Sequence, residues 1–71
     1  MNEWLDRVSA AIGSDEQLTS EDAEALLEIA RLAAHESGDR RNAPLLTYLV
    51  GRSRGGRSLS ELLEVVRASS S

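Results

Sequence analysis

Residues 19–35 read TSEDAEALLEIARLAAH, and this stretch decides the fold. Its first four residues, Thr19 to Asp22, have the form of a capping box, with acids where the helix dipole favours them. The residues that then recur at helical spacing, over more than half of the circumference, are Ala23, Ala25, Leu26, Leu27, Ile29, Ala30, Leu32, Ala33 and Ala34. Because so wide an apolar surface needs neighbours on more than one side, we expect this helix, about residues 20–36, at the centre of the fold.

A shorter amphipathic segment precedes the central helix. The pattern predicts a helix over about residues 2–12, capped by Asn2 and stopped at Gly13. The residues on its apolar arc are Trp4, Leu5, Val8, Ala11 and Ile12. We expect this arc to face the core or an interface, with Trp4 as an anchor.

Two further helices are expected after a loop, at about residues 43–54 and 59–68. Pro44 falls in the first turn of the former, where its missing N–H costs nothing. Gly51 either ends that helix or lets a neighbour approach closely. The last helix opens with a second capping box, Ser58–Glu61, and carries an apolar stripe. Four helices joined by short loops predict an all-α fold, a compact bundle.

Length and composition limit the possibilities further. The chain has 71 residues, of which 41% are hydrophobic, and it has no cysteine, so we expect one helical domain over 1–71 without disulfides or thiolate metal sites. No apolar run approaches the roughly 20 residues that cross a bilayer, and the N-terminus lacks a basic signal region. We therefore expect a cytoplasmic protein that does not bind a membrane.

Charge is distributed unevenly along the chain. Residues 1–39 contain ten acids and two arginines, whereas residues 40–57 contain five arginines and no acid. The net charge of −4 argues against nucleic-acid binding, because phosphate neutralisation needs an excess of basic residues. Two interpretations of the basic segment stay open: it is a binding site for an anion, or it complements the acidic half of the same or a neighbouring chain.

Candidate ligand-binding residues lie around this basic segment. Arg40 and Arg41 precede a helix N-terminus, whose free N–H groups could help them to hold a phosphate or carboxylate. His35 is expected in the last turn of the central helix, where a charged imidazole interacts favourably with the helix C-terminus, and this structural role is preferred to a ligand role. Tyr48 lies on an apolar face as a core or interface anchor, and Arg52, one turn later, could stack on it.

No set of residues in the sequence indicates catalysis. His35-Glu36 lacks the second histidine of a zinc-protease motif, and the Arg-rich loop lacks the lysine of a phosphate-binding P-loop. The single histidine could serve as the base of a catalytic set, but no motif in the sequence supports a nucleophile and an orienting group to accompany it. We expect neither an enzyme nor a bound metal or cofactor.

Several short elements together resemble a known family. The residues that carry the resemblance are Trp4, Leu27 to Ala34, His35, Arg41, Pro44, Tyr48 and Gly51. They resemble a small helical domain of unknown function that is common in actinobacteria. That domain occurs alone or attached to nucleotidyltransferases resembling the molybdenum cofactor guanylyltransferase. The resemblance implies association with molybdenum cofactor or nucleotide metabolism and carries no activity.

These observations favour a non-enzymatic accessory domain that binds a partner protein or its own twin, and we expect a homodimer because two helices have wide apolar faces. The alternative is a binder of a small phosphorylated ligand through His35, Arg40 and Arg41. A third interpretation, a helix-turn-helix DNA binder, is opposed by the net acidity and by Glu61 and Glu64 on its recognition helix.

Overall fold

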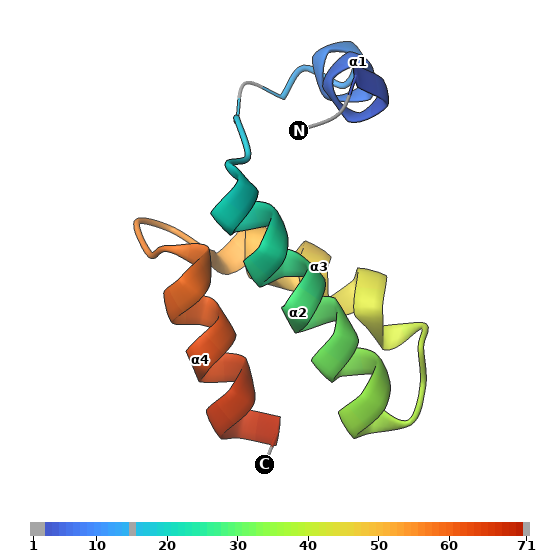
Figure 1. Cartoon of the computed structure of the whole chain (residues 1–71), viewed down its shortest axis with the longest axis vertical. Coiled ribbons are helices and arrows are strands. Elements are labelled where there is room, and N and C mark those ends of the chain that lie inside the picture. The colour runs from blue at the N-terminus through green and yellow to red at the C-terminus, as the bar shows by residue number, and fades with distance from the viewer. Residues whose placement is uncertain (1–2, 15, 71) are drawn as a thin grey trace.

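The computed structural model describes residues 3–14 and 16–70 and is built from helices (Figure 1). Their order along the chain is α1 (Glu3–Ala11), α2 (Ser20–Ser37), α3 (Asn42–Ser53) and α4 (Leu59–Ser70). The described residues contain no strand. The all-α class expected from the sequence is confirmed, whereas the expected cap Asn2 lies outside the described residues.

The ends of α2 are set by local side-chain and backbone chemistry. Thr19 Oγ1 accepts a hydrogen bond of 3.0 Å from the Asp22 amide, and the Asp22 carboxylate accepts one of 3.1 Å from the Thr19 amide. This reciprocal pair is the predicted capping box, and it satisfies two backbone amide donors that have no partner within the helix. At the other end Gly38 adopts φ 73°, a left-handed conformation that glycine reaches without steric cost.

The core lies where α2 meets α3 and α4. Both α3 and α4 pack against α2 and share few contacts with each other, so α2 is central, as its wide apolar surface predicts. Ile29 of α2 is fully buried. The other buried residues of its cluster are Ala25, Val50, Leu59 and Leu62. We call α2, α3 and α4 together the body.

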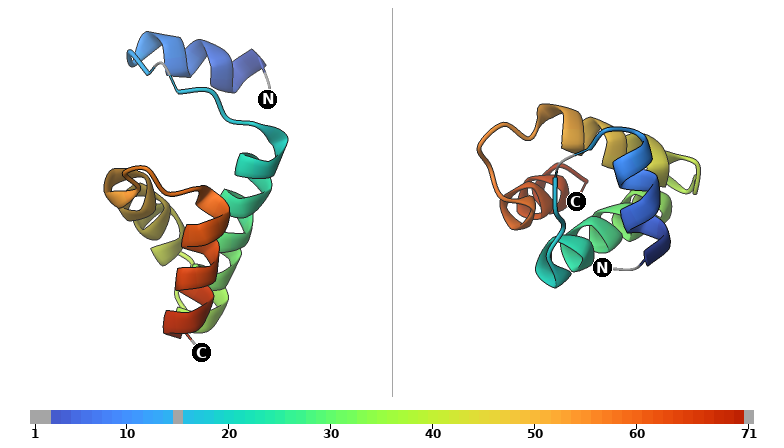
Figure 2. Two further views of the ribbon diagram at one scale, coloured as in Figure 1. Left: turned by 90° about the vertical axis from the view of Figure 1, so that its left-hand side faces the viewer. Right: turned by 90° about the horizontal axis from the view of Figure 1, so that it is seen from above.

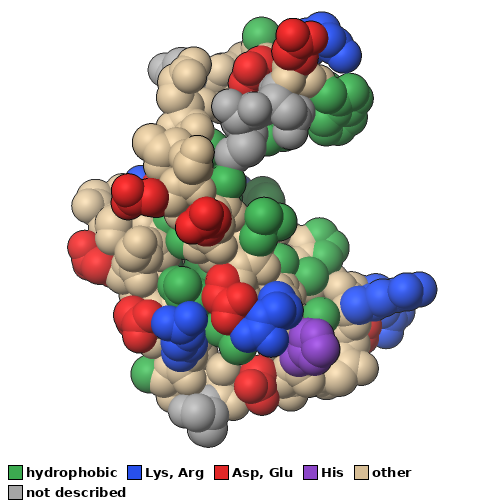
Figure 3. All heavy atoms as spheres, viewed as in Figure 1, with side chains coloured by type: hydrophobic (Ala, Val, Ile, Leu, Met, Phe, Trp, Pro, Cys, Tyr) green, Lys and Arg blue, Asp and Glu red, His purple; other side chains and the backbone are tan. Residues whose placement is uncertain are grey.

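Helix α1 stands apart from the body, beyond the end where α2 and α4 begin (Figures 1 and 2). None of its residues is buried, and Trp4 is 63% exposed. In the space-filling view α1 and the body are joined on one side only, and the outline is hollowed on the other (Figure 3). Trp4 is therefore not a core residue, and of its two expected roles the interface anchor is the one left open.

Gly51 differs from both expectations for it. The helix α3 continues past Gly51 to Ser53, so this glycine does not end the helix. A Cβ atom built on Gly51 would meet nothing within 4 Å, so no neighbour among residues 3–14 and 16–70 approaches it closely. Both expected roles are wrong within this chain, because Ser53 and the positive φ of Gly55, 61°, terminate the helix further on.

Candidate interaction surface

The α2–α3 loop holds the two consecutive arginines, and one of them is already paired. The Asp39 carboxylate accepts hydrogen bonds from the Arg41 amide at 2.9 Å and from its guanidinium Nη2 at 2.9 Å. These bonds lower the pKa of Asp39, the Arg41 side chain contributing most. The anion-binding geometry expected around Arg41 is thus occupied by a carboxylate of this chain.

Backbone donors at the start of α3 are also engaged. The Asn42 amide donates to the Asp39 carbonyl at 3.0 Å, and the Ala43 amide donates to the Arg40 carbonyl at 3.2 Å. Pro44 has no N–H to offer. The free helix N-terminus expected here is therefore closed by a turn of the chain itself.

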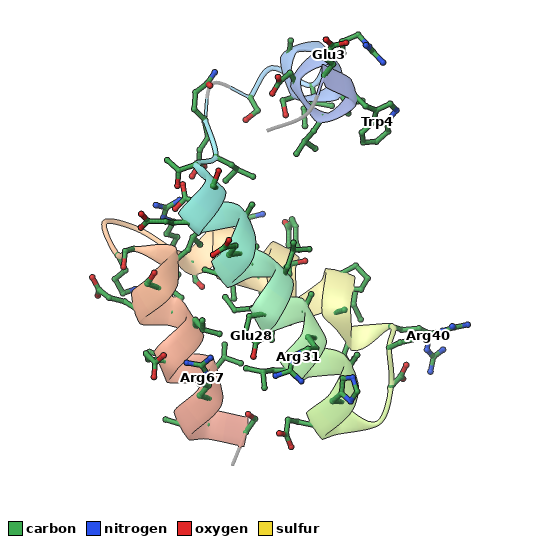
Figure 4. The ribbon with its side chains drawn as sticks, viewed as in Figure 1. Glu3, Trp4, Glu28, Arg31, Arg40 and Arg67 are labelled. Carbon is green, nitrogen blue, oxygen red and sulfur yellow. The ribbon has the colours of Figure 1, made fainter. Side chains whose placement is uncertain are left out.

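His35 and Arg40 lie together in a shallow hollow at the C-terminal end of α2. His35 falls in the last turn of α2, as expected, and both side chains are exposed. Arg40 extends from the loop away from the body (Figure 4). Within residues 3–14 and 16–70, no ion pair or side-chain hydrogen bond engages either group.

Tyr48 and Arg52 contact each other but lie outside that hollow. Arg52 Nη1 donates a hydrogen bond of 2.7 Å to the Tyr48 hydroxyl, so the guanidinium meets the edge of the side chain, whereas stacking on its ring was expected. Tyr48 is 60% exposed on the outer face of α3 and is not a core residue. The five expected site residues therefore fall into three groups: His35 with Arg40, Arg41 with Asp39, and Tyr48 with Arg52.

The basic α3–α4 loop is partly complemented by the acidic half of the chain. Arg54 forms an ion pair with Glu16 in the connector between α1 and α2. Arg57 donates to the backbone carbonyls of Ser53 and Arg54. In the part of the chain that the structure describes, neither Arg57 nor Arg52 has a carboxylate partner. Arg54 thus serves as an intramolecular complement, whereas Arg57 of the loop and Arg52 near the end of α3 keep their charge available.

A groove between α3 and α4 is mainly apolar and has a volume of about 390 Å³. We call it the apolar groove, and its apolar walls are Leu46, Leu49, Val50, Leu62, Val65 and Val66. It exists because α3 and α4 both pack on α2 but diverge from each other. Leu49 and Val65 remain 57% and 51% exposed along it, so this surface is incompletely covered.

Sequence reasoning found one wall of the apolar groove and missed the groove itself. The wide apolar face of the third helix was evident, but helical periodicity does not define the angle at which α3 and α4 cross α2. The signal that could have found it is the matching spacing of the two walls. Leu46, Leu49, Val50 and Ser53 on α3 lie at i, i+3, i+4 and i+7, as do Leu62, Val65, Val66 and Ser69 on α4.

The described residues offer neither a metal site nor a membrane span. No three histidine, aspartate or glutamate side chains in ranges 3–14 and 16–70 lie close enough to share a metal ion. No helix among them is both long and apolar enough to cross a bilayer. The chemistry available at this surface is that of apolar contact and of arginine charge.

The match to a known family extends over the whole chain. Residues 1–71 match a family described as a domain of unknown function, DUF6457. The chain belongs to this family. Membership in DUF6457 confirms the resemblance as far as a domain of unknown function that covers the chain, while its occurrence in actinobacteria and attachment to nucleotidyltransferases stay predictions. No curated protein and no solved structure matches this DUF6457 chain significantly.

Proposed function

We propose that this DUF6457 domain is a non-enzymatic, cytoplasmic interaction module whose apolar groove binds an amphipathic helix of a protein partner. The observation that carries the proposal is the exposure of Leu49 and Val65 on facing walls of one apolar groove. Apolar patches rimmed by polar residues are typical of protein interaction sites. Here Ser53, Ser69 and Arg57 provide that rim.

The shape of the groove suits a helix. Each wall presents residues at i, i+3, i+4 and i+7, which is also the spacing with which an amphipathic helix presents its anchors. Seven residues of helix cover about 10 Å, or two turns. A ligand helix of two to three turns would therefore contact the walls along their length.

The burial free energy of this contact is sufficient for binding when the bound helix brings large apolar anchors. Burying a Leu or Val side chain contributes about 1.5–3 kcal/mol when it starts fully exposed. Leu49 and Val65 start about half-exposed, so their own burial contributes less than this. Association costs about 4–15 kcal/mol, and this cost is offset only if the bound helix adds large apolar anchors of its own. The expected partner helix therefore carries an aromatic residue or several aliphatic ones.

A capture experiment with matched variants tests this function. Immobilised Leu49→Asp protein should lose the partners that wild-type protein retains from cell extract, because a buried carboxylate in the groove is costly. Leu27→Asp is the matched control, since Leu27 is 70% exposed on α2 and does not line the groove. The function is rejected if Leu49→Asp and wild-type protein retain the same proteins in equal amounts.

A second candidate function is binding of a small phosphorylated ligand through His35, Arg40 and Arg41. What supports it is that His35 and Arg40 line one hollow and have no side-chain partner among the described residues. A ligand would have to displace Asp39 to engage Arg41. Calorimetric titration of Arg41→Ala with nucleotides and pterin phosphates tests this candidate, and unchanged binding of every ligand would eliminate it.

Association with molybdenum cofactor or nucleotide metabolism is a finer proposal, supported only by the family resemblance. It predicts that the domain captures a nucleotidyltransferase from an extract of its source organism. If capture of the nucleotidyltransferase depends on Leu49, the enzyme binds through the apolar groove. If only unrelated proteins are captured, the proposed association is rejected.

A further inference from the structure

We propose that the apolar groove is occupied by α1 of a second copy of this chain, which in return receives α1 of the first. This inference rests on the groove being a helix-binding surface, as proposed above. It names the occupant and makes the assembly a symmetric dimer with exchanged N-terminal helices. Such an exchange is an economical route to a dimer, because each contact is made twice.

Helix α1 has the anchors that the groove requires. Trp4 and Val8 lie one turn apart and are 63% and 36% exposed, and Ile12, directly after the helix, is 75% exposed. The three residues share one face at i, i+4 and i+8. Trp4 projects from α1 clear of the body (Figure 4). Its size matters, because an aromatic side chain buries about 150–250 Å² and such anchors dominate interface energies.

The lengths of the two surfaces agree. From Trp4 to Ile12 the stripe covers eight residues of rise, or about 12 Å. Each wall of the groove covers seven residues of rise, or about 10 Å. A stable interface buries about 1,200–2,000 Å² in total, and one short helix falls below this size. Reciprocal exchange forms this contact twice and so doubles the buried area.

The net charges of the two elements are opposite. Glu3 and Asp6 lie in the first turn of α1, away from its apolar stripe, and they outnumber Arg7 on that helix, whereas Arg57 stands at the rim of the groove. Arg57 has no carboxylate partner among the residues the structure describes, since it donates only to backbone carbonyls. Across the whole chain the same pattern holds, with ten acids in residues 1–39 and five arginines in residues 40–57. The exchanged dimer thus brings a helix of net negative charge to a groove with an arginine at its rim.

The connector favours a second copy over the chain's own groove. At its end near α2 it is anchored by Leu18, which packs against the core, and by the ion pair of Glu16 with Arg54. At the α1 end the Ser14 amide donates to the Ser9 carbonyl at 2.9 Å, which closes a turn against the helix. Figure 2 shows that α1 runs across the end of the body at which α2 begins, and none of its residues lines the groove. With this turn intact α1 does not line its own chain's groove, and a second copy can receive it in the conformation seen here.

Sedimentation of the full chain provides the first test. Wild-type protein should be dimeric at micromolar concentration, and both Val8→Asp and Val65→Asp should raise the dissociation constant at least tenfold. Leu27→Asp should leave it unchanged, because Leu27 belongs to neither surface. Circular dichroism checks that the Val8→Asp protein is folded. Because α1 contributes no buried residue, the body of this variant should unfold as in wild type. A monomeric wild type at 100 µM, or a dimer that tolerates both aspartates, would overturn the inference.

Disulfide trapping identifies the occupant directly, because the chain has no cysteine of its own. The Val8→Cys, Val65→Cys double variant should oxidise to a covalent dimer if α1 lies in the groove of a second copy. An oxidised monomer would mean that α1 occupies its own groove, and absence of cross-linking would mean that α1 occupies neither groove. Either result overturns the exchange. The groove's proposed function fails separately, through the Leu49→Asp capture experiment, so the two failures are distinguishable.

Discussion

The Glu28 carboxylate on α2 lies 3.7 Å from the Arg67 guanidinium on α4, and the same carboxylate accepts hydrogen bonds of 2.8 and 2.5 Å from Arg31 (Figure 4). This is an ion pair between two helices of the body. The Arg31 hydrogen bond is the main cause that lowers the pKa of Glu28, and the charges of Arg31 and Arg67 act in the same direction. The relationship makes stability depend on pH.

Acid should weaken the body through Glu28. Because its pKa is lowered below the usual 4.5 in the folded state, the unfolded chain binds the proton more readily. The stabilisation is therefore fully present above pH 4.5 and is lost as pH falls through the lower, folded-state pKa. Urea unfolding of Glu28→Gln should show a smaller loss of unfolding free energy between about pH 7 and pH 3 than wild type does.

Glu24→Gln is the control for that experiment, since it removes the same charge from α2. Glu24 makes no ion pair in the described part of the chain. Its variant should retain the acid sensitivity of wild type. Equal sensitivity in Glu28→Gln and wild type would show that the carboxylate does not link the two helices in solution.

Shortening the side chain at the centre of the core should lower the unfolding free energy. Ile29 is the one fully buried large side chain among the described residues, and an Ile→Val change in such a site costs about 0.5–1.5 kcal/mol of unfolding free energy. Ile29→Val should therefore lower the urea midpoint, as followed by circular dichroism. Leu27→Ala, at a position 70% exposed and on neither proposed surface, should have little effect. Similar losses for both variants would mean that Ile29 is no more buried in solution than Leu27.

The capping box of α2 should contribute measurably. Thr19→Ala removes the oxygen that accepts from the Asp22 amide, and loss of such a cap costs about 0.5–2 kcal/mol. Thr19→Ser keeps the hydroxyl and should recover most of the stability. Thermal melts of the three proteins decide the point, and an unaltered melting temperature in Thr19→Ala would mean that water replaces the cap without cost.

Two glycines should respond in opposite directions to alanine. Gly51 is inside α3 with open space around it, so Gly51→Ala should stabilise the protein by about 0.5–1 kcal/mol, because alanine loses less entropy in a helix. Gly38 has φ 73°, where a Cβ is strained, so Gly38→Ala should destabilise it. Denaturant titrations measure both effects. If Gly51→Ala is instead destabilising, a second chain approaches that backbone.

Local order could be predicted from the sequence to a considerable extent, because the signals are local. The Thr19 cap, the central position of α2 and the exposed place of His35 each follow from residues within one or two turns. The paired state of Arg41 could also have been foreseen, since Asp39 lies two residues away. These features depend on spacing along one helix or loop, which a single sequence displays directly.

The arrangement of the helices could not be predicted in the same way. The apolar stripe with Trp4 shows that α1 has a face to bury, but it does not show which surface covers it. The apolar groove depends on the divergence of α3 from α4, which is determined by how Val50 and Leu62 pack against α2. Those contacts join residues far apart in the chain, and periodicity carries no information about them.

The exposure of Trp4 has a practical consequence for spectroscopy. The chain contains one tryptophan, and it lies on a helix outside the body. At dilutions where the chain is monomeric, its emission should therefore change little when the body melts, and fluorescence would underreport unfolding that circular dichroism detects. The same residue is a built-in reporter of assembly: transfer of its indole from water into an apolar site shifts the emission to shorter wavelength, so a dilution series read at this one side chain follows association without any label.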